Sequence, residues 1–562
     1  MMASTPLAAG SRASQQQRRR ELILVLGLCA LFFFARLQSF GLLGADEPRY
    51  AQVAHEMMER GNWITPVLYG QPWLEKPVAY YWGAIASYKL FGVSDAAARF
   101  PVALISSLMV LFVFFVYKKL RPEQSVDAAV MTASSALVAG LGRAASTDMM
   151  LAAPLTIALL SWFVWYEKGC RCWLALAYAA LGVAALAKGP VAPGLAFLVV
   201  LAFCAARREW KKLTASLWPV GLLVFFVVAL PWYAMVQHQT PQFFRVFFLE
   251  HNLARFGSNA FGHRQPFWYY LPVLLAAVAP WTVMAVAALA DGFVRLRKEL
   301  QHPAAEAESA LPLFLFLWTA VPVLFFSLSQ SKLPGYILPA IPPAMLLACG
   351  WLRRRAEEKR ALPFCMTLTH AALLAMLAAG VLVSPALLLH SRPQAAAIAL
   401  AAVAALLVFG AVAAVLRQKS WERVRYATLV PFVLIFSLAL LLDGPLLEQT
   451  QSARPVAHLL HSVGVEASEP VYTFHLRRET NFGLGFYRNS LVNAYEGLEI
   501  SPGQRRTPTA VPMRAHVLLT RAGREAELTD FFAPGQWSIT PLGTLPEQHL
   551  VVLRITPIAP ER

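Results

Sequence analysis

Charged side chains are scarce in this sequence of 562 residues. Only 14% of the residues are Asp, Glu, Lys or Arg, whereas 57% are hydrophobic, and the mean hydropathy is +0.52. A soluble protein of this length needs far more charge on its surface, so the composition excludes that class. Apolar runs of roughly 17–25 residues recur instead, and this length crosses the hydrocarbon core of a bilayer. The sequence therefore predicts a polytopic α-helical membrane protein.

Cysteines are few, and nucleotide-binding loops are missing. The six cysteines lie in apolar runs or in a turn expected on the cytoplasmic side, so no extracytoplasmic disulfide is expected. No Walker or dinucleotide-binding glycine pattern occurs near the candidate residues named below. No cleavable signal peptide is evident, because the first apolar run is long enough to remain as an anchor.

The net charge of +17 comes from short basic clusters between apolar runs. No nucleic-acid recognition motif accompanies them, so the excess of Lys and Arg indicates orientation in the membrane and not nucleic-acid binding. With the N-terminus inside, about thirteen spans place every cluster on the cytoplasmic side. The spans are expected to start near Glu21, Arg99, Val126, Met149, Cys172, Val191, Leu217, Phe267, Leu311, Tyr336, Leu362, Ala395 and Tyr426.

The composition changes near Gly444. Short β-rich segments (PVYTFHL, AHVLLT and HLVVLRI) alternate from there with more helical ones (RPVAHLLHSV and REAELTDFF). We therefore expect a transmembrane domain over residues 1–443 and a small soluble α/β domain over residues 444–562, on the outer side.

The outer connection at 44–98 is too long for a tight turn, and long loops are usually functional or disordered. It opens with GADEPRY, where Asp46 is expected at the N-cap of an interfacial helix. The apolar stripe of this helix comprises Tyr50, Val53, Ala54, Met57 and Met58, and its polar face comprises His55, Glu56 and Glu59. Asp46 could be only a helix cap, but its neighbours Glu47 and Arg49 favour a functional site, since charge at a span mouth is costly.

Further along the same connection, Glu75 and Lys76 precede Pro77, and Tyr80 follows in WLEKPVAYYW. Lys76 is expected at the start of a second interfacial helix, because a residue before proline is pushed out of helical geometry. A lysine beside a helix N-terminus suits a phosphate group. The alternative is that Lys76 has no ligand and only extends its side chain so that the ammonium group reaches the membrane interface.

The other outer connections repeat this mixture of charges. The candidates are Arg143 and Asp148 in GRAASTDMM, Lys188 in AKGPV, His251, Arg255, His263 and Arg264 in the loop at 239–266, and Lys332 and Tyr336 in SKLPGY. Cations above a bilayer, opposed by carboxylates, suit a phosphorylated lipid substrate. The outer compartment has no nucleotide-sugar pool, so a transferase here would need a donor carried by the membrane.

The segments GADEPRYAQVAHEMMERGNW, LEKPVAYYW, AKGPV and SKLPGY together resemble the GT-C glycosyltransferases that use polyprenyl-phosphate sugars. They most resemble the bacterial 4-amino-4-deoxy-L-arabinose lipid A transferases, in the same order along most of the membrane region. The combination of EKP with KLPGY carries this resemblance, because an acidic pair after the first span is shared across the superfamily.

The resemblance implies an enzyme of the bacterial inner membrane whose active site faces the periplasm. It would move aminoarabinose from undecaprenyl phosphate to a phosphate of lipid A, with inversion, and so support resistance to cationic peptides such as polymyxin. Asp46 and Asp148 match the catalytic acidic positions. The carrier-phosphate candidates are Lys76, Arg264, Tyr336, Tyr50 and Tyr80, and the further candidates are Glu47, Arg49, Arg143, Lys188, Arg255 and Lys332.

Several alternatives stay open. Glu75 with His251 or His263 could hold a divalent metal, and no other cofactor is expected. A related transferase could use another polyprenyl-phosphate sugar, or a protein or glycan acceptor. A flippase for an anionic lipid would need charges at mid-membrane and internal repeats, neither of which we find. We expect a monomer in contact with membrane lipids.

Overall fold

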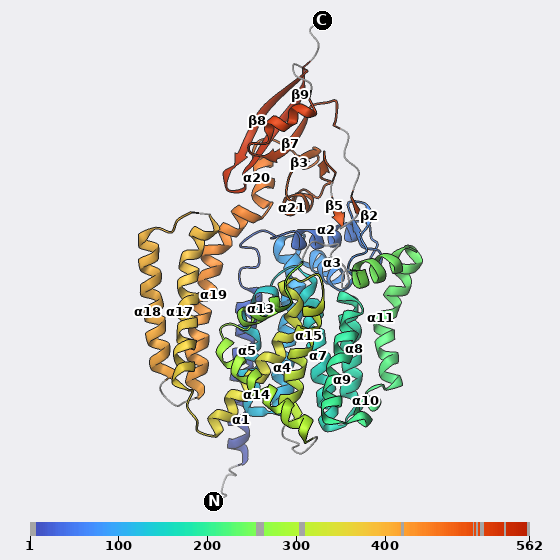
Figure 1. Ribbon diagram of the computed structural model, residues 1–562. Coiled ribbons are helices and arrows are strands. Elements are labelled where there is room, and N and C mark those ends of the chain that lie inside the picture. Colours follow the sequence, from blue (N-terminus) through green and yellow to red (C-terminus); the bar gives the residue numbers. More distant parts are fainter. Residues whose placement is uncertain are drawn as a thin grey trace, which may run out of the picture.

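The computed structural model describes residues 7–254, 264–302, 310–389, 391–416, 421–497, 499–501, 504–505, 511–532 and 536–558. Long helices form a large body, and a smaller C-terminal unit of strands and short helices sits on one end of it (Figure 1). The first helix, α1, begins at the opposite end (Figure 1). This architecture confirms a polytopic helical body with a small C-terminal unit.

Among the described residues, nine helical segments are long and apolar enough to cross a membrane. They are α4 (Asp95–Leu120), α7 (Thr147–Lys168), α8 (Arg171–Lys188), α11 (Pro219–Gln239), α15 (Ala310–Leu328), η6 (Pro334–Ala340) joined to α16 (Ile341–Glu357), α17 (Phe364–Leu388), α18 (Ala395–Leu416) and α19 (Trp421–Gln451). The predicted number of about thirteen spans is therefore only partly confirmed. The last of these helices continues past Gly444, the expected domain boundary.

The other predicted spans are shorter, broken or partly polar helices. They are α1 (Leu7–Cys29) with η1 (Ala30–Phe34), α5 (Ser125–Ala133) with α6 (Ala136–Leu141), α9 (Val191–Arg207), and η4 (Phe267–Tyr269) with α13 (Tyr270–Ala277). The break after α5 has a local cause. The hydroxyls of Ser134 and Ser135 donate to the carbonyl oxygens of Val130 and Thr132, and such bonds compete with helix continuation.

The remaining elements of the helical body are α2 (Asp46–Glu59), β1 (Val67–Leu68), β2 (Gln71–Pro72), α3 (Ala79–Phe91), η2 (Pro122–Gln124), α10 (Trp210–Ser216), η3 (Arg245–Ala254) and α14 (Thr282–Gln301). Ion pairs connect basic residues of these clusters to carboxylates on neighbouring helices. Lys118 Nζ lies 2.6 Å from Glu21 Oε2, and Arg425 Nη1 lies 2.8 Å from Asp127 Oδ1. These contacts place the clusters at 18–20, 118–121 and 421–425 at one end of the body, as the orientation rule requires.

The first outer connection forms a layer between the helical body and the C-terminal unit. The C-terminal helix α21 (Arg478–Arg488) lies over α2 in this layer (Figure 1). The ring of His55 is buried 6.5 Å from that of Phe486 in α21, and Asn489 Nδ2 donates to Glu59 Oε1 at 2.7 Å. Glu56 is also buried, and its carboxylate accepts from the N–H groups of Tyr69 and Gly70. The polar face of α2 is therefore covered by other parts of the chain.

The C-terminal unit contains a five-stranded mixed sheet in the order β4-β3-β7-β9-β8. Its elements are α20 (Arg454–Ser462), β3 (Val471–Phe474), α21, β4 (Asn493–Ala494), β7 (His516–Arg521), η7 (Glu525–Asp530), β8 (Trp537–Leu545), η8 (Pro546–Gln548) and β9 (Leu550–Pro557), beside a separate pair β5 (Glu499–Ser501) and β6 (Gln504–Arg505). Strand β3 is parallel to β4 and β7, and β9 is antiparallel to β7 and β8. The predicted strands β3, β7 and β9 and the helix α20 are confirmed.

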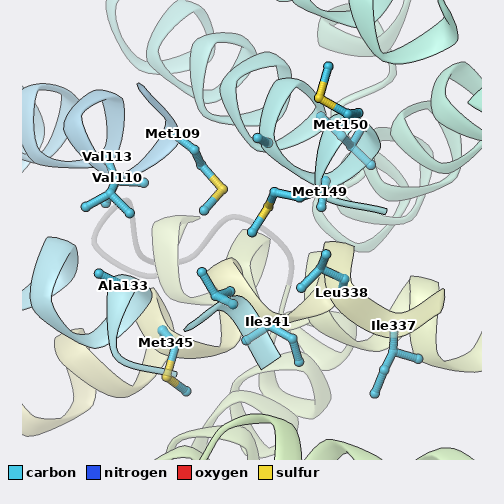
Figure 2. Packing of buried hydrophobic residues seen from close by; sticks show 14 of the residues in the cluster. Met109, Val110, Val113, Ala133, Met149, Met150, Ile337, Leu338, Ile341 and Met345 are labelled. Atoms are coloured by element: carbon cyan, nitrogen blue, oxygen red, sulfur yellow. The ribbon is translucent and has the colours of Figure 1, made fainter. Parts of the chain in front are cut away.

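Buried side chains from several helices meet in the middle of the body, and ten of them are labelled in Figure 2. Met149 of α7 and Ile337 of η6 belong to this cluster, and both are fully buried. Each directly follows a candidate residue, Asp148 and Tyr336 respectively. Closely packed buried side chains can move little, so this cluster fixes the start of α7 and the break before α16.

Candidate active site

A cavity of about 480 Å³ brings together candidates from four separate outer connections. Glu75, Lys76, Asp148, Lys188 and Tyr336 all line it. Its other walls are mainly apolar and comprise Leu151, Pro190, Val191, Gly194, Leu195, Phe247, Phe248, Phe325, Phe326, Ser329, Ser331 and Gly335. A few convergent polar groups in an apolar cavity are typical of a ligand site.

Asp148 and Lys188 form an ion pair at the wall of this cavity. Lys188 Nζ donates to Asp148 Oδ1, and the same ammonium group lies 5.5 Å from the centre of the Tyr336 ring. Gly335 allows the close approach, because a Cβ atom there would lie 3.2 Å from the carboxylate carbon of Asp148. The start of α7, the end of α8 and the break before α16 are thus held together by these side chains.

Asp46 and Arg49 lie next to this cavity without lining it. Arg49 Nη2 donates to Asp46 Oδ1 at 2.5 Å, and the Asp46 side chain is 53% exposed. Burial would lower the pKa of Arg49, but the carboxylates of Glu75 and Asp46 raise it overall. Arg49 thus links Asp46 electrostatically to Glu75 in the cavity wall.

Helix capping does not explain either aspartate. The N-cap of α2 is Ala45, not Asp46 as predicted, and the N-cap of α7 is Ser146. Asp46 and Asp148 lie in the first turns of these helices, where a negative charge interacts favourably with the helix dipole. Their side chains bond to Arg49 and Lys188. The predicted capping role of Asp46 is therefore wrong.

Tyr50 lies behind Arg49 in a cluster of aromatic rings. Its ring centre is 5.8 Å from that of Trp73 and 6.1 Å from that of Tyr80. Both tyrosines are buried, and the Tyr80 hydroxyl donates to the carbonyl oxygen of Ala98 at 3.0 Å. Neither tyrosine lines the cavity. The structure therefore gives them a supporting position behind Arg49.

Glu47 is bound by an arginine that the sequence analysis did not single out. Its carboxylate accepts from Arg99 Nε at 3.0 Å and Nη2 at 2.7 Å, and from the backbone N–H groups of Leu43 and Ala145. Burial would raise the pKa of Glu47, but Arg99 and these bonds lower it overall. Arg99 also donates to the carbonyl oxygens of Leu37, Phe40 and Gly41. The ion pair between Glu47 and Arg99 therefore stabilises the loop that leads to Asp46.

Arg143 is also a structural residue in this arrangement. Its Nη2 atom donates to the carbonyl oxygen of Ala35 at 2.6 Å, and its guanidinium lies 5.7 Å from the centre of the Phe436 ring. It is buried and lies outside the cavity lining. Arg143 therefore joins the end of the first helix to α19.

Arg264 and Lys332 line a second cavity of about 420 Å³, which adjoins the first. Ser329 lines both cavities. Lys332 Nζ donates to the carbonyl oxygens of Ser329 at 2.5 Å and Gln265 at 3.1 Å. Burial and the charge of Arg264 lower the pKa of Lys332. Two cations therefore lie beside the first cavity, Arg264 in the segment before η4 and Lys332 in the segment after α15.

Three candidates lie outside the part of the chain that is described. They are Arg255, His263 and the side chain of His251. Within the described ranges, no three His, Cys, Asp or Glu side chains are close enough to hold a metal ion. The expected metal site at Glu75, which needs His251 or His263, therefore stays a prediction.

Comparison with known proteins identifies related sequences. Residues 21–247 match the family described as dolichyl-phosphate-mannose-protein mannosyltransferase. The chain is 34% identical over 356 residues to undecaprenyl phosphate-alpha-4-amino-4-deoxy-L-arabinose arabinosyl transferase 2 of Pseudomonas fluorescens (strain Pf0-1), which covers 61% of this chain and 62% of the relative. It is 32% identical over 337 residues to the arabinosyl transferase of Edwardsiella ictaluri, with 59% of each covered. The match thus spans about six tenths of these curated relatives.

Solved structures share the fold over almost the whole chain. The crystal structure of ArnT from Cupriavidus metallidurans bound to undecaprenyl phosphate gives a TM-score of 0.75 at 22% identity, covering 95% of this chain and 97% of that one. The apo structure of the same protein gives a TM-score of 0.74 at 22% identity, covering 96% and 98%. The shared fold therefore includes both the helical body and the C-terminal unit.

Proposed function

We propose that this chain is a glycosyltransferase of the GT-C type and that it transfers 4-amino-4-deoxy-L-arabinose from undecaprenyl phosphate to a phosphate of lipid A. The observation that carries this proposal is the cavity in which Lys76, Lys188 and Tyr336 face Glu75 and Asp148 between apolar walls. Such a site can hold a phosphate, a sugar and the start of a lipid tail together. The names of the similar relatives supply the sugar and its carrier.

Adjoining apolar cavities offer a path for the tail of the carrier. The charged cavity is the one lined by Glu75, Lys76, Asp148, Lys188 and Tyr336. Another cavity of about 450 Å³ shares Pro190 and Phe248 with it. A further cavity of about 230 Å³ shares Pro193, Phe225 and Phe226 with that one. Both are lined largely by side chains of α8, α9 and α11. In this proposal the polyprenyl tail leaves the charged cavity along these helices and reaches the membrane laterally.

The residues suit a displacement at the anomeric carbon of the sugar. A phosphate oxygen of the acceptor attacks this carbon while the bond to the carrier phosphate breaks, and the electron pair leaves with the carrier. Lys76 and Tyr336 stabilise the departing phosphate, because charge-assisted hydrogen bonds strengthen as negative charge develops. Asp46 stabilises the positive charge that develops on the sugar ring. A phosphate acceptor is already anionic, so proton removal contributes little.

The adjoining cavity with Arg264 and Lys332 suits the phosphate of the acceptor. A lipid in the outer half of the membrane would reach it at the end of the helical body that carries the C-terminal unit. The proposal places this end in the periplasm, because the basic clusters lie at the other end. If the protein transfers a different sugar or uses a protein acceptor, only the broader assignment to the GT-C glycosyltransferases would remain.

The carrier part of this proposal is tested at Lys76. Lys76→Ala should weaken binding of undecaprenyl phosphate about tenfold or more, because a charge-assisted hydrogen bond to the phosphate is lost. Lys76→Arg should restore binding only in part, since arginine keeps the charge but not the geometry. The measurement is the rise in melting temperature of the purified protein with added undecaprenyl phosphate.

Lys89→Ala is the matched control for this measurement. Lys89 is an exposed lysine of α3 whose ammonium group lies 4.6 Å from the centre of the Trp63 ring, outside the cavity. Its removal should leave the effect of the carrier unchanged. An equal rise in melting temperature for wild type and Lys76→Ala would rule out the phosphate role of Lys76.

A further inference from the structure

The backbone that leads into Asp46 is held from the C-terminal unit as well as from the helical body. The N–H group of Leu42 donates to the hydroxyl oxygen of Tyr487 at 2.7 Å, although the two residues lie 445 positions apart. The same N–H group lies 3.2 Å from Asp95 Oδ1, and the Tyr487 hydroxyl donates to that oxygen at 2.5 Å. Leu42, Tyr487 and Asp95 thus form a closed triangle of hydrogen bonds.

Arg454, the first residue of α20, ties the same backbone from a second direction. Its Nη1 atom donates to Asp95 Oδ2 at 3.0 Å and to the carbonyl oxygen of Gln38 at 3.2 Å. Its Nε and Nη2 atoms hold both carboxylate oxygens of Glu448 at 2.6 Å, near the end of α19. This bidentate geometry fixes the guanidinium plane, so Arg454 can define the position of the loop.

The contact at Gly41 is too close for any side chain. A Cβ atom at this position would lie 2.7 Å from the hydroxyl oxygen of Tyr487 and 3.1 Å from Cβ of Arg454. The loop therefore passes directly against the C-terminal unit. On the other side, Arg99 binds the carbonyl oxygen of Gly41, and Glu47 binds the N–H group of Leu43.

A separate contact reaches the partner of Asp46. The guanidinium of Arg49 lies 5.5 Å from the centre of the Phe482 ring, on the helix that also carries Tyr487. Helix α21 thus approaches Asp46 through Leu42 on one side and through Arg49 on the other. Both contacts come from the same short helix, so a displacement of α21 would move both.

We propose that Tyr487 and Arg454 are positioning residues, through which the C-terminal unit fixes the loop that carries Asp46. Neither residue lines the charged cavity, so neither touches the reacting groups. A small displacement of a reacting group lowers turnover strongly, whereas it changes carrier binding at Lys76 little. The turnover effect rests on the proposed transferase function, but the structural effect on the loop does not.

Tyr487→Phe tests this proposal, because it removes one hydroxyl group and keeps the ring. Hydrogen–deuterium exchange of the purified protein should become faster at residues 41–46 and stay unchanged in β3 and β7. In the transfer assay, kcat should fall about tenfold while KM for the lipid-linked sugar changes less than about twofold. Arg454→Lys should give an intermediate effect on both readouts, since it keeps a charge for Asp95 but not the bidentate contact.

Tyr495→Phe is the matched control within the C-terminal unit. The Tyr495 hydroxyl is buried and bonds to His516 Nε2, far from the loop at 41–46 in the sequence. It should leave both loop exchange and kcat unchanged. Unchanged loop exchange in Tyr487→Phe and Arg454→Lys would overturn the proposal, and so would faster exchange throughout the sheet. If wild type transfers no aminoarabinose, the exchange result still decides the structural claim, and the proposed function alone fails.

Discussion

Asp46→Asn is expected to lower the rate of sugar transfer about a hundred- to a thousandfold, because in the proposed mechanism the carboxylate of Asp46 stabilises the positive charge that develops on the sugar ring. Asparagine has the same shape and can still accept a hydrogen bond from Arg49. Arg49 would keep this hydrogen bond and the nearby carboxylate of Glu75, but it would lose the charged carboxylate oxygen that lies 2.5 Å away in the wild type. Carrier binding, measured by melting temperature, should change little, since Asp46 does not line the cavity.

Asp291→Asn is a suitable control for this prediction. Asp291 pairs with Arg295 and Arg354 at the end of the helical body that carries the basic clusters. It should leave the transfer rate close to that of wild type. Near wild-type turnover in Asp46→Asn would mean that this carboxylate serves only to hold Arg49.

Glu47→Gln is expected to lower the free energy of unfolding by about 3–5 kcal/mol, because it leaves Arg99 buried without the carboxylate that is hydrogen-bonded to it. The Arg99 side chain is 1% exposed, so water cannot replace the lost carboxylate. Melting temperature in detergent and the yield of folded protein are the measurements. Glu358→Gln is the control, since its exposed pair with Arg360 should contribute less than about 1 kcal/mol.

The same pair predicts a dependence on pH. The pKa of Glu47 is lower in the folded protein than its usual value, because Arg99 and its hydrogen bonds offset the effect of burial. This stabilisation is present above the unfolded-state pKa and is lost as the pH falls through the folded-state value. Wild type should therefore lose more stability on acidification than Glu47→Gln. Equal acid sensitivity of both proteins would contradict the ionised state of Glu47.

Hydropathy predicted the long helices well but not the broken ones. Periodic apolar runs report length, whereas the break after α5 depends on two serine hydroxyls that turn back onto the backbone. The strands β3, β7 and β9 were predicted because they are short and rich in β-branched residues. Strand β8 was missed, since its pattern is mostly exposed and contains Pro541 and Gly543.

The cavity residues could be predicted because buried charge in a membrane protein is rare and costly. Lys76 lies within the first outer connection, Asp148 and Lys188 lie at two span mouths, and the structure brings all three to one cavity. The cost of buried charge could not distinguish the structural role of Glu47 and Arg99 from the proposed catalytic role of Asp46. This criterion identifies charged residues but does not show which residue each one pairs with. Tyr487 and Arg454 were missed because long-range contacts leave no local pattern in the sequence.

The central proposal is that this chain adds an aminosugar to lipid A. Mass spectrometry of lipid A from cells that carry wild type, Asp46→Asn or a deletion tests it most directly. The account predicts that the added aminoarabinose mass is present with wild type and absent from both other strains. An identical lipid A spectrum in all three strains would contradict the claim, and the acceptor would then have to be sought among other periplasmic molecules.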